Sequence, residues 1–106
     1  MTLQIHTRSG LLDLHDPNPD QLTLETIATG LSQICRFSGQ TPRFYSVAEH
    51  SIQLSRMTSL RYSMHALFHD AAEAFLGDVT APIKQRMPEY ALLEENLLWH
   101  IFNRFK

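Results

Sequence analysis

The chain is organised around residues 67–78, which read Leu67-Phe68-His69-Asp70-Ala71-Ala72-Glu73-Ala74-Phe75-Leu76-Gly77-Asp78. An adjacent His-Asp pair lies here inside a pattern typical of a helix with 3.6 residues per turn. One broad apolar face is formed by Met64, Leu67, Phe68, Ala71, Ala74 and Phe75. The opposite face carries His65, His69, Asp70 and Glu73. We therefore expect one helix over about residues 60–76, ended by Gly77, that presents a polar site on a packed element.

Length and composition are those of a single globular domain over residues 1–106. The chain is 43% hydrophobic and 19% charged, which is typical of folded proteins. A net charge of -2 offers no basic surface and argues against duplex nucleic acid as a partner. The single cysteine, Cys35, cannot form an internal disulfide and fits a reducing compartment. With no long apolar run and no secretion leader, we expect a cytoplasmic protein without a membrane partner.

Helical patterns dominate the rest of the chain. The first 22 residues are expected to be extended, with a short hairpin around Ser9-Gly10. Ser46 and Glu49 form a capping box at the start of a helix. Further helices are expected over about residues 23–35, 46–57 and 88–105, with a short helical turn beginning at Thr80. The sequence therefore predicts an all-α fold, a compact helical bundle with a short extended N-terminal segment.

A group of metal-binding side chains is the strongest functional signal. His69, Asp70 and Glu73 point into one volume. His50 lies on the apolar stripe of its helix, where a lone histidine is more often a core residue than a ligand. His69 and Asp70, however, need a further ligand from another helix, which favours His50 as that ligand. The resulting mixed nitrogen and oxygen set suits Mn²⁺, Fe²⁺, Co²⁺, Ni²⁺, Zn²⁺ or Mg²⁺. His65 forms a rival His-x₃-His pair with His69, which nothing nearby completes.

Such a cluster, with nearby charged residues, is suited to hydrolysis of a phosphate ester. A bound metal lowers the pKa of water and polarises a phosphoryl oxygen. Glu73 is placed to position or deprotonate that water, and Asp78 to transfer a proton or bind substrate. Arg36 and Arg43 lie in an aromatic-rich loop and have the donor geometry that phosphate needs. Two solvated arginines in an anchored loop are an equally good interpretation of that segment.

Two segments of the chain, Val47-Ala48-Glu49-His50-Ser51 and residues 69–78, resemble the His…His-Asp…Asp signature of the HD-domain metal-dependent phosphohydrolases. Arg36-Phe37 is similar to the Arg-Trp pair of the bacterial 5′-deoxynucleotidases, and the resemblance covers almost the whole chain. It implies an HD-like helical bundle. It also implies roles for individual residues: His50, His69 and Asp70 as metal ligands, with Glu73, Asp78 and Arg36 as catalytic or phosphate-binding groups.

The chain departs from this family at its C-terminal end. The fourth ligand of the family is an aspartate on a later helix, and no aspartate follows Asp78. We therefore expect a C-terminally shortened HD domain with a weakened metal site. An apolar stripe formed by Ile101, Phe102 and Phe105 would lack the later helices that cover it, which predicts a homo-oligomer.

Three functions from different classes follow. The preferred one is a divalent-metal phosphohydrolase of small-molecule deoxynucleotides, with a 5′-monophosphate ahead of a triphosphate as substrate. The second is an impaired HD domain that binds nucleotide or metal as a regulatory module. The third is a helical adaptor that docks through Leu92, Trp99 and the terminal aromatic residues.

Overall fold

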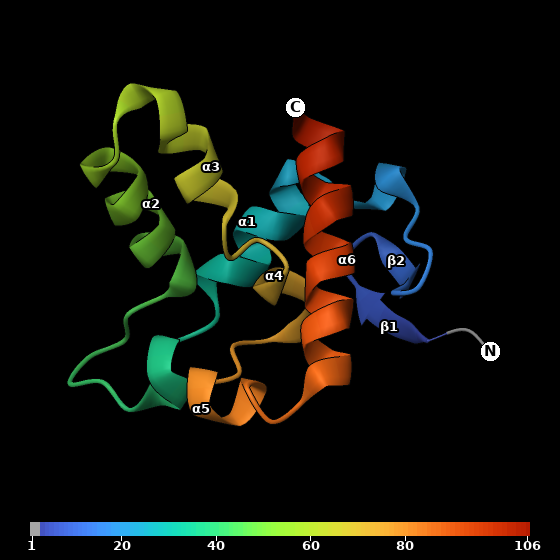
Figure 1. The fold of residues 1–106 in the computed structure, drawn as a ribbon, viewed down its shortest axis with the longest axis horizontal. Coiled ribbons are helices and arrows are strands. Elements are labelled where there is room, and N and C mark those ends of the chain that lie inside the picture. Colours follow the sequence, from blue (N-terminus) through green and yellow to red (C-terminus); the bar gives the residue numbers. More distant parts are fainter. Residues whose placement is uncertain (1–2) are drawn as a thin grey trace.

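The computed structural model describes residues 3–106, which form six helices and one small sheet (Figure 1). The strands are β1 (Gln4–Thr7) and β2 (Gly10–Asp13). The helices are α1 (Leu24–Ser32), α2 (Val47–Met57), α3 (Ser63–Phe68), α4 (Glu73–Leu76), α5 (Ala81–Lys84) and α6 (Pro88–Phe105). Short 3₁₀ turns lie at Pro19–Gln21, Arg36–Gly39 and Leu60–Tyr62. No helix in residues 3–106 is long and apolar enough to cross a membrane.

The N-terminal hairpin makes the fold a mixed one, so the expectation of an all-α fold was wrong. Strands β1 and β2 pair in antiparallel register, with Gln4 opposite Asp13 and Thr7 opposite Gly10. The hairpin belongs to the core, because Leu12 on β2 has no exposed surface. The hairpin expected around Ser9-Gly10 is present, but it was expected as an extended appendage to a helical bundle and not as part of the core. The structure is mainly helical with a two-stranded antiparallel sheet.

Local capping signals located the helix starts correctly. The Thr23 hydroxyl accepts a hydrogen bond from the Thr26 N–H at 3.1 Å at the start of α1. The Ser46 hydroxyl does the same for the Glu49 N–H at 3.0 Å at the start of α2. These bonds satisfy N–H groups that have no partner inside the helix. Helix α6 has the bounds that its periodicity predicts, and α5 follows Thr80 as expected.

The single helix expected over residues 60–76 was wrong, because a tight turn at residues 69–72 divides it. Helix α3 ends at Phe68 and α4 begins at Glu73. In between, the N–H groups of Ala71 and Glu73 donate to carbonyls three residues earlier, at 3.0 and 2.9 Å. This spacing is that of a 3₁₀ turn, which winds more tightly than an α-helix. Glu73 is thereby directed inward and is 6% exposed.

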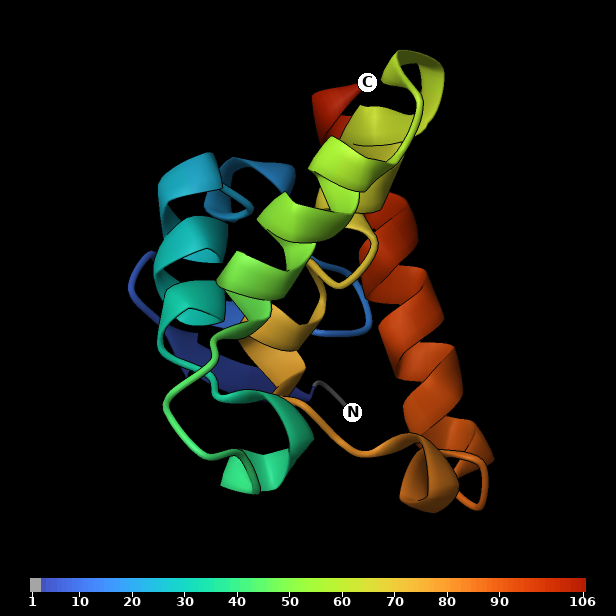
Figure 2. The same cartoon turned by 90° about the vertical axis from the view of Figure 1, so that its left-hand side faces the viewer.

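Helix α6 packs along one side of the core. Leu97 and Ile101 have no exposed surface, and the Asn96 side-chain amide donates to the Leu14 carbonyl at 3.4 Å. Figure 2 shows α6 on one side of the molecule and α1 with α2 on the other, with α4 between them. Helix α4 therefore lies inside the fold, where its position is set by elements on both sides.

Helices α1 and α4 approach each other most closely at Gly30. A Cβ atom on Gly30 would lie 2.8 Å from the Ala74 carbonyl oxygen and 3.0 Å from the Ala74 Cβ. Glycine, which has no Cβ, permits this separation of the two backbones. The contact places α1 directly behind the residue that follows Glu73, and so α1 supports the polar site without contributing a polar side chain to it.

Candidate metal centre

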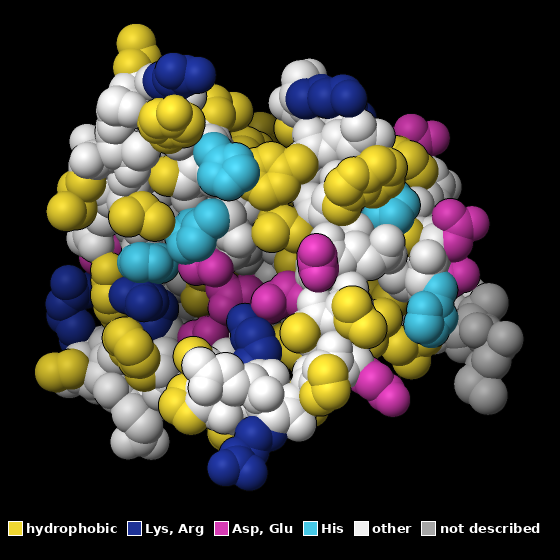
Figure 3. Space-filling view, viewed as in Figure 1, with side chains coloured by type: hydrophobic (Ala, Val, Ile, Leu, Met, Phe, Trp, Pro, Cys, Tyr) yellow, Lys and Arg dark blue, Asp and Glu magenta, His cyan; other side chains and the backbone are white. Residues whose placement is uncertain are grey.

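Two separate segments bring His50, His69 and Asp70 together. His50 lies in the first turns of α2, and His69 and Asp70 lie in the tight turn between α3 and α4. One potential ligand atom from each residue lies within 4.8 Å of the other two. Their side chains are 21–30% exposed, so the cluster is partly buried and still open to solvent. In Figure 3, histidine and acidic side chains gather in a hollow on this face, next to lysine or arginine.

Hydrogen bonding orients the ring of His69. Its Nδ1 lies 2.6 Å from the Ala66 carbonyl oxygen, so Nδ1 carries the hydrogen and donates it. Its Nε2 faces the Asp70 Oδ2 at 2.9 Å, and the His50 Nε2 lies 3.9 Å from the same oxygen. A backbone carbonyl that binds one ring nitrogen leaves the other nitrogen as the ligand atom, an arrangement common in metal-binding histidines.

The protonation of the three groups is coupled. The hydrogen bond to Asp70 raises the pKa of His69, although burial opposes it. Burial, together with the charge of Arg36, lowers the pKa of His50. Burial alone would raise the pKa of Asp70, but the hydrogen bond and charge of His69 outweigh it, and the pKa of Asp70 is lowered. A neutral His50 and an ionised Asp70 are in the forms that bind a cation.

A pocket of about 330 Å³ opens beside this cluster. It is lined by Arg36, Phe37, Val47, Asp70, Glu73, Asp78, Val79, Thr80, Ala81, Pro82 and Lys84. We call it the polar pocket. Four of the side chains singled out in the sequence therefore line one cavity, namely Arg36, Asp70, Glu73 and Asp78. Acidic and basic groups face the same small volume, which is the arrangement expected where a cation and an anionic substrate meet.

Glu73 is the most unusual residue of the polar pocket. Its Oε2 is buried and has no hydrogen-bond partner. Burial, reinforced by the Asp78 and Asp70 carboxyl groups, raises the pKa of Glu73 to about 9. A buried polar atom without a partner is rare and calls for a missing water or ion. Two imidazole nitrogens and the Asp70 carboxylate form a donor set that fits a divalent cation, and Glu73 lines the adjoining polar pocket.

Arg36 is held at the pocket wall by a short backbone pairing. Its N–H donates to the Tyr45 carbonyl at 2.8 Å, and the Val47 N–H donates to the Ile34 carbonyl at 2.9 Å. The Arg36 guanidinium lies 4.5 Å from the centre of the Phe37 ring, a favourable cation–π distance. Phe37 and Ser38 have φ angles of 56° and 54°, in the left-handed region that such residues avoid. This turn places the arginine beside the start of α2.

Arg43, by contrast, lies outside the polar pocket. Its side chain is 74% exposed and lies 3.6 Å from the Glu49 carboxylate. It also donates to the neighbouring Phe44 carbonyl at 3.3 Å. The structure therefore separates the two arginines that the sequence had grouped together, because the loop between them folds back and returns only Arg36 to the site.

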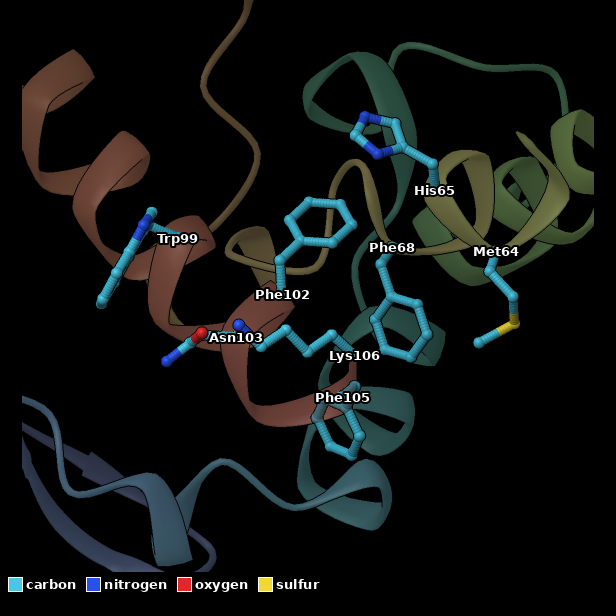
Figure 4. A pocket seen from close by; sticks show the side chains of 8 residues that line it. All are labelled: Met64, His65, Phe68, Trp99, Phe102, Asn103, Phe105 and Lys106. Carbon is cyan, nitrogen blue, oxygen red and sulfur yellow. The ribbon is translucent and has the colours of Figure 1, made fainter. Parts of the chain in front are cut away.

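His65 also lies apart from the cluster, and the rival His-x₃-His site is not formed. Its ring stacks on Phe102, with centres 4.8 Å apart. Within residues 3–106, the group of His50, His69 and Asp70 is the candidate metal cluster. Figure 4 shows His65 at an apolar cavity of about 340 Å³, which we call the α3–α6 groove. This groove is lined by Met64, His65, Phe68, Trp99, Phe102, Asn103, Phe105 and Lys106.

Lys84 is the pocket residue that sequence reasoning missed. It lies at the end of α5, and its Nζ is 3.0 and 2.9 Å from the two carboxylate oxygens of Glu94 on α6. The sequence pattern marked the start of α5 through Thr80 and Pro82, but it carried no sign that this helix faces the metal cluster. The pairing joins two helices across a loop, so helical spacing could not reveal it.

Comparison with known proteins identifies relatives without a described activity. No family model matches the chain. It is 40% identical over 94 residues to the uncharacterized protein YfdR of Escherichia coli (strain K12), covering 88% of this chain and 53% of YfdR. It is 38% identical over 104 residues to an uncharacterized protein of Rhodobacter capsulatus, covering 89% of this chain and 53% of that protein. The chain thus spans about half the length of these relatives.

Proposed function

We propose that the chain is an HD-type, divalent-metal-dependent phosphohydrolase that acts on (deoxy)nucleotides. The observation that carries the proposal is the meeting of His50, His69 and Asp70 within 4.8 Å at a pocket that also contains Arg36 and the buried Glu73. Metal-assisted phosphate hydrolysis needs ligands for a cation, a side chain that binds an anion and a nearby carboxyl group, and these residues provide all three.

Each residue has a distinct part in this proposal. His50, His69 and Asp70 hold the cation, which supplies an activated water and polarises the phosphoryl group. Arg36 binds the phosphate oxygens through its planar fork of donors. Glu73, in the ionised form that a cation beside it favours, orients the attacking water and accepts its proton. Asp78 at the pocket wall donates to the leaving group or binds the sugar.

A 5′-monophosphate is the preferred substrate, ahead of a triphosphate. The polar pocket is lined by two cationic side chains, Arg36 and Lys84, and by three carboxyl groups. This balance of charge suits one phosphate group better than a chain of three, because each added phosphate brings further repulsion from Asp70 and Asp78.

The test is hydrolysis of a panel of deoxynucleoside mono- and triphosphates with Mn²⁺ or Co²⁺. We expect phosphate release from monophosphates, lost in Asp70→Ala. Arg36→Ala should raise KM, whereas Arg43→Ala serves as a matched control, because Arg43 lies outside the polar pocket, and should leave KM unchanged. Failure to hydrolyse either substrate class with any metal overturns the proposal. Tight binding of nucleotide without hydrolysis would instead support the regulatory module, which a three-ligand cluster also permits.

A further inference from the structure

We propose that Lys84 is a second phosphate-binding residue of the polar pocket, kept in position by Glu94. This inference rests on the proposed function and extends it to a side chain and a helix that the sequence signature does not include. It identifies the substrate group as a phosphate monoester dianion, bound between Arg36 and Lys84.

The position of Lys84 is the first argument. Residues 78–84 form one wall of the polar pocket, with Lys84 at the end of α5. Arg36 reaches the same pocket from the turn before α2. The two cations therefore come from different segments and line one cavity of about 330 Å³.

The contact with Glu94 is the second argument. The Lys84 ammonium lies 3.0 and 2.9 Å from the two Glu94 oxygens, and the two side chains are 27% and 21% exposed. Glu94 does not line the polar pocket, so it contacts the Lys84 ammonium from outside the pocket. An ammonium has three N–H donors, and Glu94 engages two contacts at most. One donor therefore remains for an anion in the pocket.

A purely structural ion pair is the competing explanation. Partly exposed ion pairs add little stability, and joining α5 to α6 would not require the lysine to line a pocket that already contains an arginine. Two cations also match the charge of a phosphate monoester, which carries two negative charges, better than that of a diester, which carries one. Lys84 would then favour monoesters over diesters.

The experiment is calorimetric titration of the Mn²⁺-loaded chain with inorganic phosphate, for the wild type and three variants. Lys84→Met removes the cation. Glu94→Gln removes the competing carboxylate but leaves Lys84 charged. Arg86→Met is the matched control, because Arg86 is an exposed cation two residues from Lys84 that does not line the pocket.

We expect Lys84→Met to weaken phosphate binding about 10- to 100-fold, as for loss of one charge-assisted hydrogen bond. Glu94→Gln should bind phosphate as tightly as the wild type or more tightly, because the anion no longer competes with Glu94. Arg86→Met should bind as the wild type does. In turnover assays, Lys84→Met should raise KM for a monophosphate and change kcat little.

Two results would overturn the inference. One is unchanged phosphate affinity in Lys84→Met. The other is a parallel loss of phosphate affinity and of melting temperature in Lys84→Met and Glu94→Gln. That result would show that the Lys84–Glu94 ion pair only stabilises the packing of α5 on α6. Phosphate binding that depends on Lys84, without turnover of any nucleotide, would support the inference and count against the hydrolase proposal, so the two fail separately.

Discussion

The polar pocket and the α3–α6 groove are nearly equal in size, at about 330 and 340 Å³, and opposite in character. The polar pocket takes its side chains from four segments of the chain, and acidic and basic groups dominate its chemistry. The groove takes its side chains from two helices, and four of its eight lining residues are aromatic. Phe68 and Phe105 stack across it with ring centres 5.3 Å apart.

The two cavities have opposite effects on the stability of the fold. Aromatic side chains in the groove bury area and strengthen the fold. In the polar pocket, by contrast, Glu73 is buried without a hydrogen-bond partner for Oε2, which costs stability. We therefore expect substitutions in the polar pocket to affect metal binding and catalysis, and substitutions in the groove to affect stability and association.

The largest expected effect is the loss of bound metal in His69→Ala or Asp70→Ala. Each change removes a ligand atom from a three-residue cluster, and the partly exposed position should let the fold survive. Elemental analysis after equilibration with Mn²⁺ measures the metal, and circular dichroism checks the fold. His65→Ala is the control from the α3–α6 groove and should retain its metal. Full metal content in either ligand variant would place the site elsewhere.

Glu73→Ala should retain metal and lose turnover by a factor of order 10²–10⁴, the usual contribution of a general base. The assay measures kcat for a monophosphate in the metal-loaded variant. If Glu73→Ala instead loses its metal, the orphaned oxygen is a fourth ligand rather than a base.

Phe105→Ala should lower the free energy of unfolding by about 1–3 kcal/mol, because the ring is only half-buried and a fully buried Phe costs more. Urea denaturation measures the change, and metal content should stay at the wild-type level. A variant with normal stability and impaired metal binding would contradict the separation of roles between the groove and the pocket.

The pH dependence of stability should distinguish wild type from Glu73→Gln in the metal-free chain. The pKa of Glu73 is raised from 4.5 to about 9. Between these values, the folded chain keeps a proton that the unfolded chain releases, so the free energy of unfolding falls as pH rises. Glutamine resembles the protonated acid and removes this dependence. Denaturation at a series of pH values should show that the free energy of unfolding of Glu73→Gln increases relative to that of the wild type as the pH rises to about 9. Parallel curves would mean that Glu73 ionises normally.

The smallest expected effect is weak association through the α3–α6 groove. Met64 and Trp99 at its rim are 59% and 62% exposed, and exposed apolar surface of this kind favours contact between proteins. Light scattering over a range of concentrations should detect a homo-oligomer, reduced in Trp99→Glu. A strict monomer at all concentrations would contradict this prediction.

Sequence patterns predicted the elements and residues that depend on local spacing. Helices α2 and α6 were placed correctly because a serine cap and an apolar period are readable within one element. His69 and Asp70 were predicted to lie in one cluster because they are adjacent in the sequence. His50 was added because that cluster needs a further ligand from another helix. In the apolar stripe, Ile101 is fully buried, and Phe102 and Phe105 are partly buried against the core. The homo-oligomer expected from this stripe stays a prediction.

Features that depend on contacts between distant residues were missed. An apolar period does not distinguish the 3₁₀ bonding at residues 69–72 from a continuous helix, so the inward turn of Glu73 was not predicted. The spacing of Lys84 and Glu94 gives no sign that they pair between α5 and α6. The loop that carries Arg36 and Arg43 offered two equivalent arginines, and only its left-handed turn at Phe37 and Ser38 separates them.

The packing of α6 against the core has a consequence for the order in which the chain folds. Leu97 and Ile101 fill the core between elements that are synthesised much earlier, including β2 and α1. Until those residues leave the ribosome, the apolar faces of the earlier elements have no covering surface, and few stabilising contacts are complete. Folding of this region must therefore wait for α6, and a nascent chain that stalls before residue 97 would be a target for chaperones and prone to aggregation.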